Sequence, residues 1–269
     1  MKLEKILLNA FLISNLLFTN VSAQTKFRDN FPLELRKYQY EARLAKKAGK
    51  ERPEKFKKEN LEEDISGYIN IDIKKQENNY IIDVDSYPAK SIANLFGGFK
   101  MHIQTRLSCQ EKNKSQHYKV LESISKNNYR ILFVFINETK KSEYLKTDSE
   151  QEIELKINKR KFFVPSDTQD ILTSMINLFA EDYSKSGKYH IGKLKGDDKT
   201  PTDIYVDITK NNDDYIAEMT LPEETLLSNK TPLKTYYRKK NGKVKISRLE
   251  IFIKKFTINN WVVATPIKN

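Results

Sequence analysis

Beyond Leu61 the chain alternates between apolar and polar residues in short runs with a period of two. Clusters of Asn, Asp, Gly and Lys interrupt these runs at intervals of about ten residues, a spacing typical of turns between strands. Because successive side chains of a strand point to opposite faces, this pattern gives each strand one apolar and one polar face. Strands are predicted over residues 64–73, 80–86, 99–109, 118–124, 129–136, 151–157, 189–194, 203–209, 215–221, 235–238, 243–256 and 261–265. The chain beyond Leu61 is therefore predicted to be an antiparallel meander.

Two of the predicted strands depart from simple alternation. The run from Ile131 to Ile136 is continuously apolar, which is typical of a central strand that is covered on both faces. In the strand over 243–256 the alternation slips by one residue near Arg248. Such a slip predicts a β-bulge, which inserts one extra residue and re-aims the side chains that follow it.

Residues 168–184 are the one stretch of the later chain with a clear helical period. Apolar residues recur there three or four positions apart, so they lie on one face of a helix. Ser166 and Gln169 have the spacing of a capping box, and Gly187 follows where the helix is expected to end. The pattern predicts an amphipathic helix that packs its apolar face on the sheet.

Two other segments have a weaker helical pattern. Residues 88–96 are expected to form a short helix that a pair of glycines stops. Residues 35–48 are compatible with a helix that ends at Gly49, although its apolar stripe is thin.

Together these elements predict a mainly β protein in which a strongly curved antiparallel sheet, half-barrel-like, holds one packed amphipathic helix. The expected organisation is a signal peptide over 1–23, a basic N-terminal arm or linker over 24–60 and a β-rich domain over 61–269. One large domain suits this length, because single cores stop growing only at about 250–300 residues.

The N-terminal segment has the pattern of an export signal. An apolar run follows two lysines and ends in small residues at Ala23, after which cleavage is expected. The mature protein is therefore predicted to be periplasmic or secreted. The alternative is a membrane anchor, but asparagines interrupt the run and it is shorter than the roughly 20 residues that cross a bilayer. Gln24 follows the cleavage site, so no cysteine stands there for lipid attachment.

Positive charge is abundant in this chain. It carries 48 Lys and Arg against 36 Asp and Glu, a net charge of +12. Residues 24–60 alone hold twelve basic and six acidic residues. Because basic surfaces attract polyanions of several kinds, the expected partners are a lipid, an anionic membrane surface or an envelope protein, whereas export argues against nucleic acid. A general lysine bias and a loosely docked N-terminus are the alternative explanations.

The sequence contains no evident catalytic, cofactor-binding or metal-binding motif. Cys109 is the single cysteine, so no intramolecular disulfide can form. His102, His117 and His190 fall in separate predicted strands without a partner at zinc-ligand spacing. Gly-x-Ser-x-Gly does not occur, and eight glycines are too few for phosphate-cradling loops. We therefore predict no catalytic residue, cofactor or metal.

Pairs of neighbouring aspartates are the remaining candidates for chemistry, because glycoside cleavage needs two carboxyl groups that face one bond. The pairs are Asp83/Asp85, Asp197/Asp198 and Asp213/Asp214. The first pair shares one face of a predicted strand, whereas the other two fall in turns, where Asp is common for backbone reasons.

Several segments between Ser66 and the C-terminus carry a family resemblance. They are Ser66-Gly67-Tyr68-Ile69-Asn70-Ile71, Asn79-Tyr80-Ile81-Ile82, Ile92-Ala93-Asn94-Leu95-Phe96 leading into 99–107, Asp170-Ile171-Leu172-Thr173-Ser174-Met175 after Pro165, and the closing hairpin of 248–254 with 260–264. In these the chain resembles an exported bacterial family, domain of unknown function 3108. The resemblance implies a secreted or periplasmic protein with a curved antiparallel sheet around a helix.

These observations predict an exported binding or scaffold protein of the cell envelope. Its concave face, between the sheet and the helix, is the expected site for a lipid or for an extended apolar segment of a partner. One alternative is a carboxylate-based hydrolase of envelope polymers. The other is a structural or assembly protein, which would have a filled interior and an exposed strand edge.

Overall fold

The computed structural model describes residues 31–45, 61, 64–89, 100–112, 115–131, 134–194, 200–221, 231–255 and 258–267. Its strands are β1 (Lys37–Leu44), β2 (Gly67–Gln76), β3 (Asn79–Pro88), β4 (Lys100–Lys112), β5 (Ser115–Ile131), β6 (Val134–Lys146), β7 (Glu152–Ile157), β8 (Arg160–Pro165), β9 (Thr168–Gln169), β10 (Gly187–Leu194), β11 (Thr202–Asn211), β12 (Asp214–Leu221), β13 (Thr231–Lys240), β14 (Lys243–Lys255) and β15 (Ile258–Pro266). The helix among the described residues is α3 (Ile171–Ala180).

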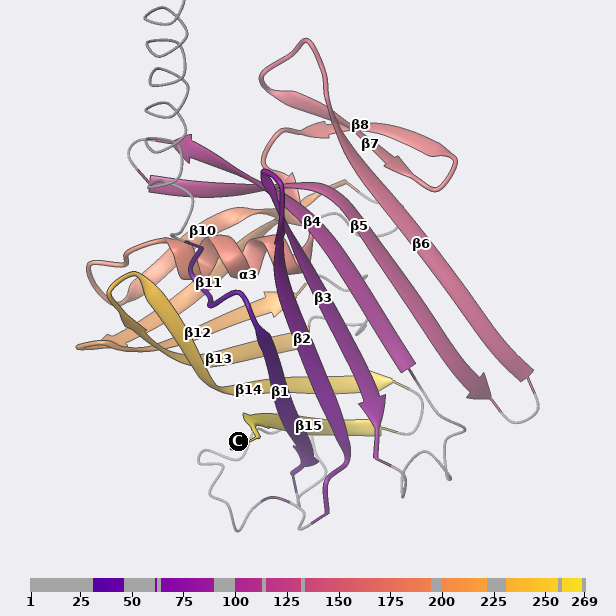
Figure 1. The fold of residues 1–269 in the computed structure, drawn as a ribbon, viewed down its shortest axis with the longest axis vertical. Coiled ribbons are helices and arrows are strands. Elements are labelled where there is room, and N and C mark those ends of the chain that lie inside the picture. The colour runs from indigo at the N-terminus through magenta and orange to yellow at the C-terminus, as the bar shows by residue number, and fades with distance from the viewer. Residues whose placement is uncertain are drawn as a thin grey trace, which may run out of the picture.

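All of these strands belong to one 15-stranded sheet, which bends until it nearly closes on itself (Figure 1). From β1 the order runs through β2 to β8 on one side, and through β15 back to β9 on the other. Every pair of neighbours is antiparallel except β9 with β10, which is parallel. The predicted fold class, a mainly β protein with a strongly curved antiparallel sheet and one packed helix, is confirmed.

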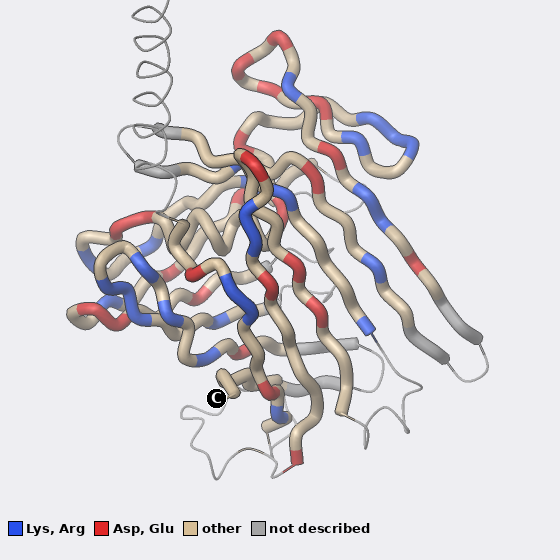
Figure 2. The backbone as a smooth tube through the Cα atoms, in the orientation of Figure 1, with Lys and Arg blue, Asp and Glu red and all other residues tan. Residues whose placement is uncertain are grey.

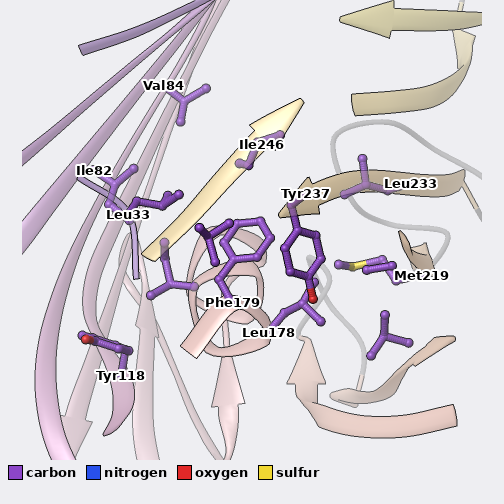
Figure 3. Packing of buried hydrophobic residues seen from close by; sticks show 14 of the residues in the cluster. Leu33, Ile82, Val84, Tyr118, Leu178, Phe179, Met219, Leu233, Tyr237 and Ile246 are labelled. Atoms are coloured by element: carbon purple, nitrogen blue, oxygen red, sulfur yellow. The ribbon is translucent and has the colours of Figure 1, made fainter. Parts of the chain in front are cut away.

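The inside of the curve is a packed hydrophobic core around α3. Leu178 and Phe179 of the helix are buried between the two halves of the sheet (Figure 3). The Phe179 ring meets Tyr237 of β13 edge to face, with centroids 5.1 Å apart, and Met219 of β12 lies beside them. Because interiors are close-packed, this helix is the element that fills the space which a bent sheet encloses.

Residues 31–45, expected to belong to an arm or linker, are part of the sheet and the core. Phe31 is 1% exposed, and its ring stacks on Tyr80 with centroids 4.4 Å apart and meets Tyr118 edge to face at 5.2 Å. β1 lies at the middle of the strand order, between β2 and β15. The helix predicted over 35–48 is therefore wrong over Lys37–Leu44, where buried Tyr40 and Ala42 follow a period of two.

Replacing Phe31 by Ala tests this docking. We expect a loss of about 3–5 kcal/mol in the free energy of unfolding, because the change removes a buried ring and leaves a cavity between two tyrosines. Urea denaturation of the mature protein measures it. Leu35, which is 45% exposed, supplies the control: Leu35→Ala should change stability by less than about 0.5 kcal/mol. Equal effects of the two substitutions would contradict the role of Phe31.

A buried amide holds the sheet together where one of its strands lacks a neighbour. β4 pairs with β5 from Ser115 onward, but pairing of β5 with β6 starts only at Glu122. Asn177 of α3 occupies the vacant side of Tyr118: its Oδ1 accepts the backbone N–H at 2.8 Å, and its Nδ2 donates to the carbonyl at 2.9 Å. The side chain thus supplies the hydrogen bonds that a neighbouring strand would have made.

The same amide reaches the far end of the sheet. Asn177 Nδ2 also donates to Gln169 Oε1 at 2.9 Å, and Gln169 Nε2 donates to the carbonyl of Ile191 in β10. Both amides are 5% exposed. Gly192, with a φ of +123°, lets the Gln169 side chain approach, since a Cβ there would overlap it. We call Asn177, Gln169 and their backbone partners the amide clasp.

Asn177→Ala should destabilise the protein by about 2–5 kcal/mol, because two backbone groups of Tyr118 and the Gln169 oxygen lose their partners inside the core. Asn177→Asp keeps an acceptor for the Tyr118 N–H but loses both donations, so we expect a comparable loss. Chemical denaturation followed by near-ultraviolet circular dichroism measures both. The matched control is Asn211→Ala on the exposed end of β11, for which a loss as large as that of Asn177→Ala would refute the clasp.

Three local predictions have clear outcomes, and a fourth is largely untested. The predicted helix exists but is shorter than 168–184. Asp170 is its N-cap, with Oδ1 accepting the Thr173 N–H at 2.8 Å. The two residues before Asp170, Thr168 and Gln169, form β9. The single strand over 129–136 is wrong, because Ile131 pairs with Val134 and the run folds back as the end of the β5–β6 hairpin. The bulge near Arg248 is confirmed, since the β13–β14 register skips Ser247. The helix over 88–96 lies largely outside the described residues, and Pro88 ends β3.

No helix in the described part of the chain has the length and apolar character that a bilayer crossing requires. The signal segment 1–23 lies outside the described residues, so export and cleavage stay predictions.

Candidate functional site on the outer face of the sheet

The alternation of β3 and β4 divides their side chains between the core and the outer face. Ile82 and Val84 of β3 are buried, so Asp83 and Asp85 lie on the opposite, outer face. On β4, Ile103 is buried and His102 is its outward-facing neighbour. The register pairs Asp85 with His102 and Asp83 with Gln104. The predicted common face of the two aspartates is confirmed.

An imidazole links these two carboxylates. His102 Nδ1 lies 2.9 Å from Asp85 Oδ1, while its Nε2 lies 4.0 Å from Asp83 Oδ1. Gln104 Nε2 donates to the same Asp83 oxygen at 2.8 Å. Both carboxylates therefore already have partners on an open face, and they act as groups that orient neighbouring side chains.

The rest of this face balances its own charge. Lys74 of β2 binds Asp72 at 2.8 Å, and Lys141 of β6 lies 2.8 Å from both Glu122 and Glu143. Hydrogen bonds to Glu122 and then Glu143 raise the pKa of Lys141, and Lys141 lowers the pKa of Glu143. Figure 2 shows basic and acidic positions interspersed along these strands. Such exposed pairs contribute little stability, but they leave little uncompensated charge.

Lys100 and Lys126 are the exceptions on this part of the face. Both are exposed, and no carboxylate of the described residues lies within ion-pair distance of either ammonium. They border a shallow cavity of about 490 Å³ around His102. Its lining residues are Asn70, Asp85, Ser86, Tyr87, Lys100, Met101, His102, Lys126 and Asn128. We call this cavity the outer-face site.

Apart from Asp85 and the His102 ring that contacts it, the remaining polar groups of the outer-face site are amides and hydroxyls. Asn70 Nδ2 donates to the Tyr87 hydroxyl at 3.2 Å, and the Tyr87 ring lies beside Tyr68 with centroids 5.5 Å apart. Ser86 and Asn128 complete the set. Two ammonium groups, amides, hydroxyls and a ring wall, beside the one carboxylate that His102 engages, suit a small anion that also carries hydroxyl groups.

The other sequence candidates do not join this site. His190 Nε2 lies 2.9 Å from Asp203 Oδ1 on β10 and β11, and Asp214 pairs with Arg238, which lowers the pKa of Asp214. Cys109 is exposed on β4. The pair Asp197/Asp198 lies outside the described residues. Within the described chain, no three His, Cys, Asp or Glu side chains are grouped so that they could hold a metal ion.

A second, smaller cavity of about 230 Å³ lies along the vacant edge of β5, between β6, β7 and β9. His117, Lys119, Tyr144 and Thr168 are among its lining residues. Burial raises the pKa of Tyr144, so that phenol stays neutral. This cavity adjoins the amide clasp and holds none of the aspartate candidates.

Comparison with family models, with curated proteins and with solved structures gives no match. The resemblance to domain of unknown function 3108 therefore stays a prediction. The outer-face site rests on its own geometry.

The sequence predicts only the aspartate part of this site. Alternation places Asp83 and Asp85 on one face. Local spacing gives His102 no acidic partner, because the strand pairing that brings it to Asp85 is not visible in that spacing. Lys100 and Lys126 gave no signal of their own among 48 basic residues. Their position becomes informative only once the register of β4 with β5 is known.

Proposed function

We propose that the protein is an exported, non-enzymatic binding protein of the cell envelope, and that its outer-face site holds the headgroup of an anionic lipid. The observation that carries the proposal is the pair of ammonium groups, Lys100 and Lys126, that have no ion-pair partner among the described residues. They border a cavity whose other polar lining groups are amides, hydroxyls, the His102 imidazole and the Asp85 carboxylate, which His102 contacts. A glycerol phosphate headgroup has the matching chemistry, since its phosphate is an anion and its hydroxyls bind amides.

The location of the site supports this choice. The concave side, where a lipid was expected, holds one continuous cluster of buried side chains among the described residues. The outer face is open to solvent, and a sheet surface can approach a membrane over several strands. Each Lys near an anionic surface contributes about 1 kcal/mol to association, so a modest site suffices for peripheral binding.

Vesicle cosedimentation tests the proposal. The mature protein should sediment with phosphatidylglycerol vesicles and stay in solution with phosphatidylcholine vesicles. Replacing Lys100 and Lys126 together by Gln should lower the partition coefficient roughly 30-fold, because two contacts of about 1 kcal/mol each are lost. Soluble glycerol 1-phosphate should compete for the site, whereas an equal concentration of sulfate should compete less.

The control has the same change of charge on another surface. Lys240 and Lys245 are exposed beside the β13–β14 turn, and the double Gln variant there should change partitioning by less than about threefold. Equal losses in the two double variants would show that vesicle binding depends on overall positive charge and not on the outer-face site. Absence of binding by the unchanged protein would reject the proposal.

A further inference from the structure

The outer face carries an apolar patch at its rim. Five large hydrophobic residues are exposed in the described chain, and two of them, Leu145 and Phe163, share one row of this face. The register joins Leu145 of β6 to Glu154 of β7, and Glu154 to Phe163 of β8. Phe163 is 69% exposed, which is high for a phenylalanine.

β8 is also the last strand of the sheet on this side. Figure 1 shows β7 and β8 at the rim beyond β6. The other end of the sheet, β9, has two residues and is held by the amide clasp. Edge strands are templates for pairing unless they are short or blocked, so β8 is the edge with the greater capacity for another strand.

The backbone groups that β8 presents to the open side follow from its pairing. The Asn158 N–H donates to the Lys141 carbonyl of β6 at 2.8 Å, so the preceding residue, Ile157, turns its backbone groups toward β8. Arg160 is the register partner of Ile157 and turns toward β7. The backbone N–H and C=O groups of successive residues point to opposite sides of a strand. Those of Lys161, Phe163 and Pro165 therefore point to the open edge of the sheet. Pro165 has no N–H to present, as expected for an edge strand.

We propose that a second copy of this chain pairs with β8 in antiparallel register, with Phe163 opposite Phe163 of the other copy. The two residues would exchange N–H to carbonyl hydrogen bonds, and their rings would lie side by side on one face. Lys161 would face Pro165 of the other copy and donate its N–H to that carbonyl.

Charge favours this register and this occupant. Glu152 is the β7 partner of Pro165. Pairing Lys161 with Pro165 of the second copy therefore brings Lys161, which lies 3.0 Å from Glu154 of its own chain, near the second copy's Glu152 as a second carboxylate. Glu152 is exposed and has no ion-pair partner among the described residues. Figure 2 shows the basic positions gathered at the β7–β8 turn, away from the centre of the proposed contact. No pair of like charges falls directly opposite in this register.

Sedimentation velocity over a concentration series tests the pairing in the mature protein. We expect a monomer–dimer equilibrium. Phe163→Lys should raise the dimer dissociation constant about tenfold or more, because it buries two ammonium groups side by side. Glu152→Lys should weaken the dimer by placing a lysine near Lys161, whereas Glu150→Lys, an exposed residue in the preceding turn, makes the same change of charge and should leave the equilibrium within about twofold.

Cross-linking tests the register. In a Cys109→Ser background, Phe163→Cys should form a disulfide dimer on mild oxidation, because directly opposed residues have Cα atoms about 5.5 Å apart. Lys161→Cys should not form a disulfide dimer, because in this register the two Lys161 residues lie four positions apart along the paired strands. A monomer at every concentration, equal cross-linking at both positions, or equal effects of Glu152→Lys and Glu150→Lys would overturn the proposal. Loss of vesicle binding alone would leave it intact, since the two surfaces carry different residues.

Discussion

The structure depends on the amide clasp, because a bent open sheet must satisfy the backbone groups that its curvature leaves without a neighbouring strand. β5 extends past the start of its pairing with β6, and Tyr118 lies in that stretch. A Tyr118 N–H and carbonyl without partners would each leave a desolvated polar group against the core. Asn177 satisfies both, and through Gln169 it connects the β5 side of the sheet to β10. The position of α3, and with it the packing of Phe179 on Tyr237, follows from this contact.

The contrast between the two faces of the sheet follows from the same geometry. Inward positions meet α3 and the opposite half of the sheet, so they form one core that begins with Phe31. Outward positions meet water along most of β2 to β8, and there the chain uses cross-strand charge pairs, such as Lys141 with Glu122 and Glu143. A few residues of this face depart from the pattern of paired charges. Among the described residues, Lys100 and Lys126 have no ion-pair partner, and Phe163 is 69% exposed.

Local pattern predicted the elements of this fold better than their connections. Alternation placed eleven of the fifteen strands but missed β1, β8, β9 and most of β6. The slip near Arg248 gave the bulge at Ser247, because a slip, like alternation, is a property of a few neighbouring residues. The helix existed as predicted, but its start was misplaced, since Asp170 competes with Ser166 as a cap and tertiary contacts of Gln169 draw that residue into β9. The apolar run at 131–136 predicts one central strand, because periodicity cannot show a chain reversal inside a continuously apolar run.

The candidate site was harder to predict than the fold because it is made by register. Asp83 and Asp85 shared a face by simple counting, but His102 comes to Asp85 only through the β3–β4 pairing, and Lys126 comes beside His102 only through the β4–β5 pairing. The basic composition of residues 24–60 predicts an N-terminal arm or linker, but Tyr40 and Ala42 pack in the core. Net charge therefore indicates the sign of the expected partner but not the surface that would meet it.

The two proposed surfaces are geometrically compatible, and this bears on how the protein would act. Residues directly opposite in an antiparallel pair point to the same side of the sheet, so pairing Phe163 with its copy joins the outer faces of two chains on one side. Both outer-face sites then belong to one extended surface. A single site with two lysines gives weak attachment to an anionic membrane, but two sites on one rigid surface bind with a high effective concentration for the second contact. The edge strand would thus convert a weak headgroup site into a stable peripheral association.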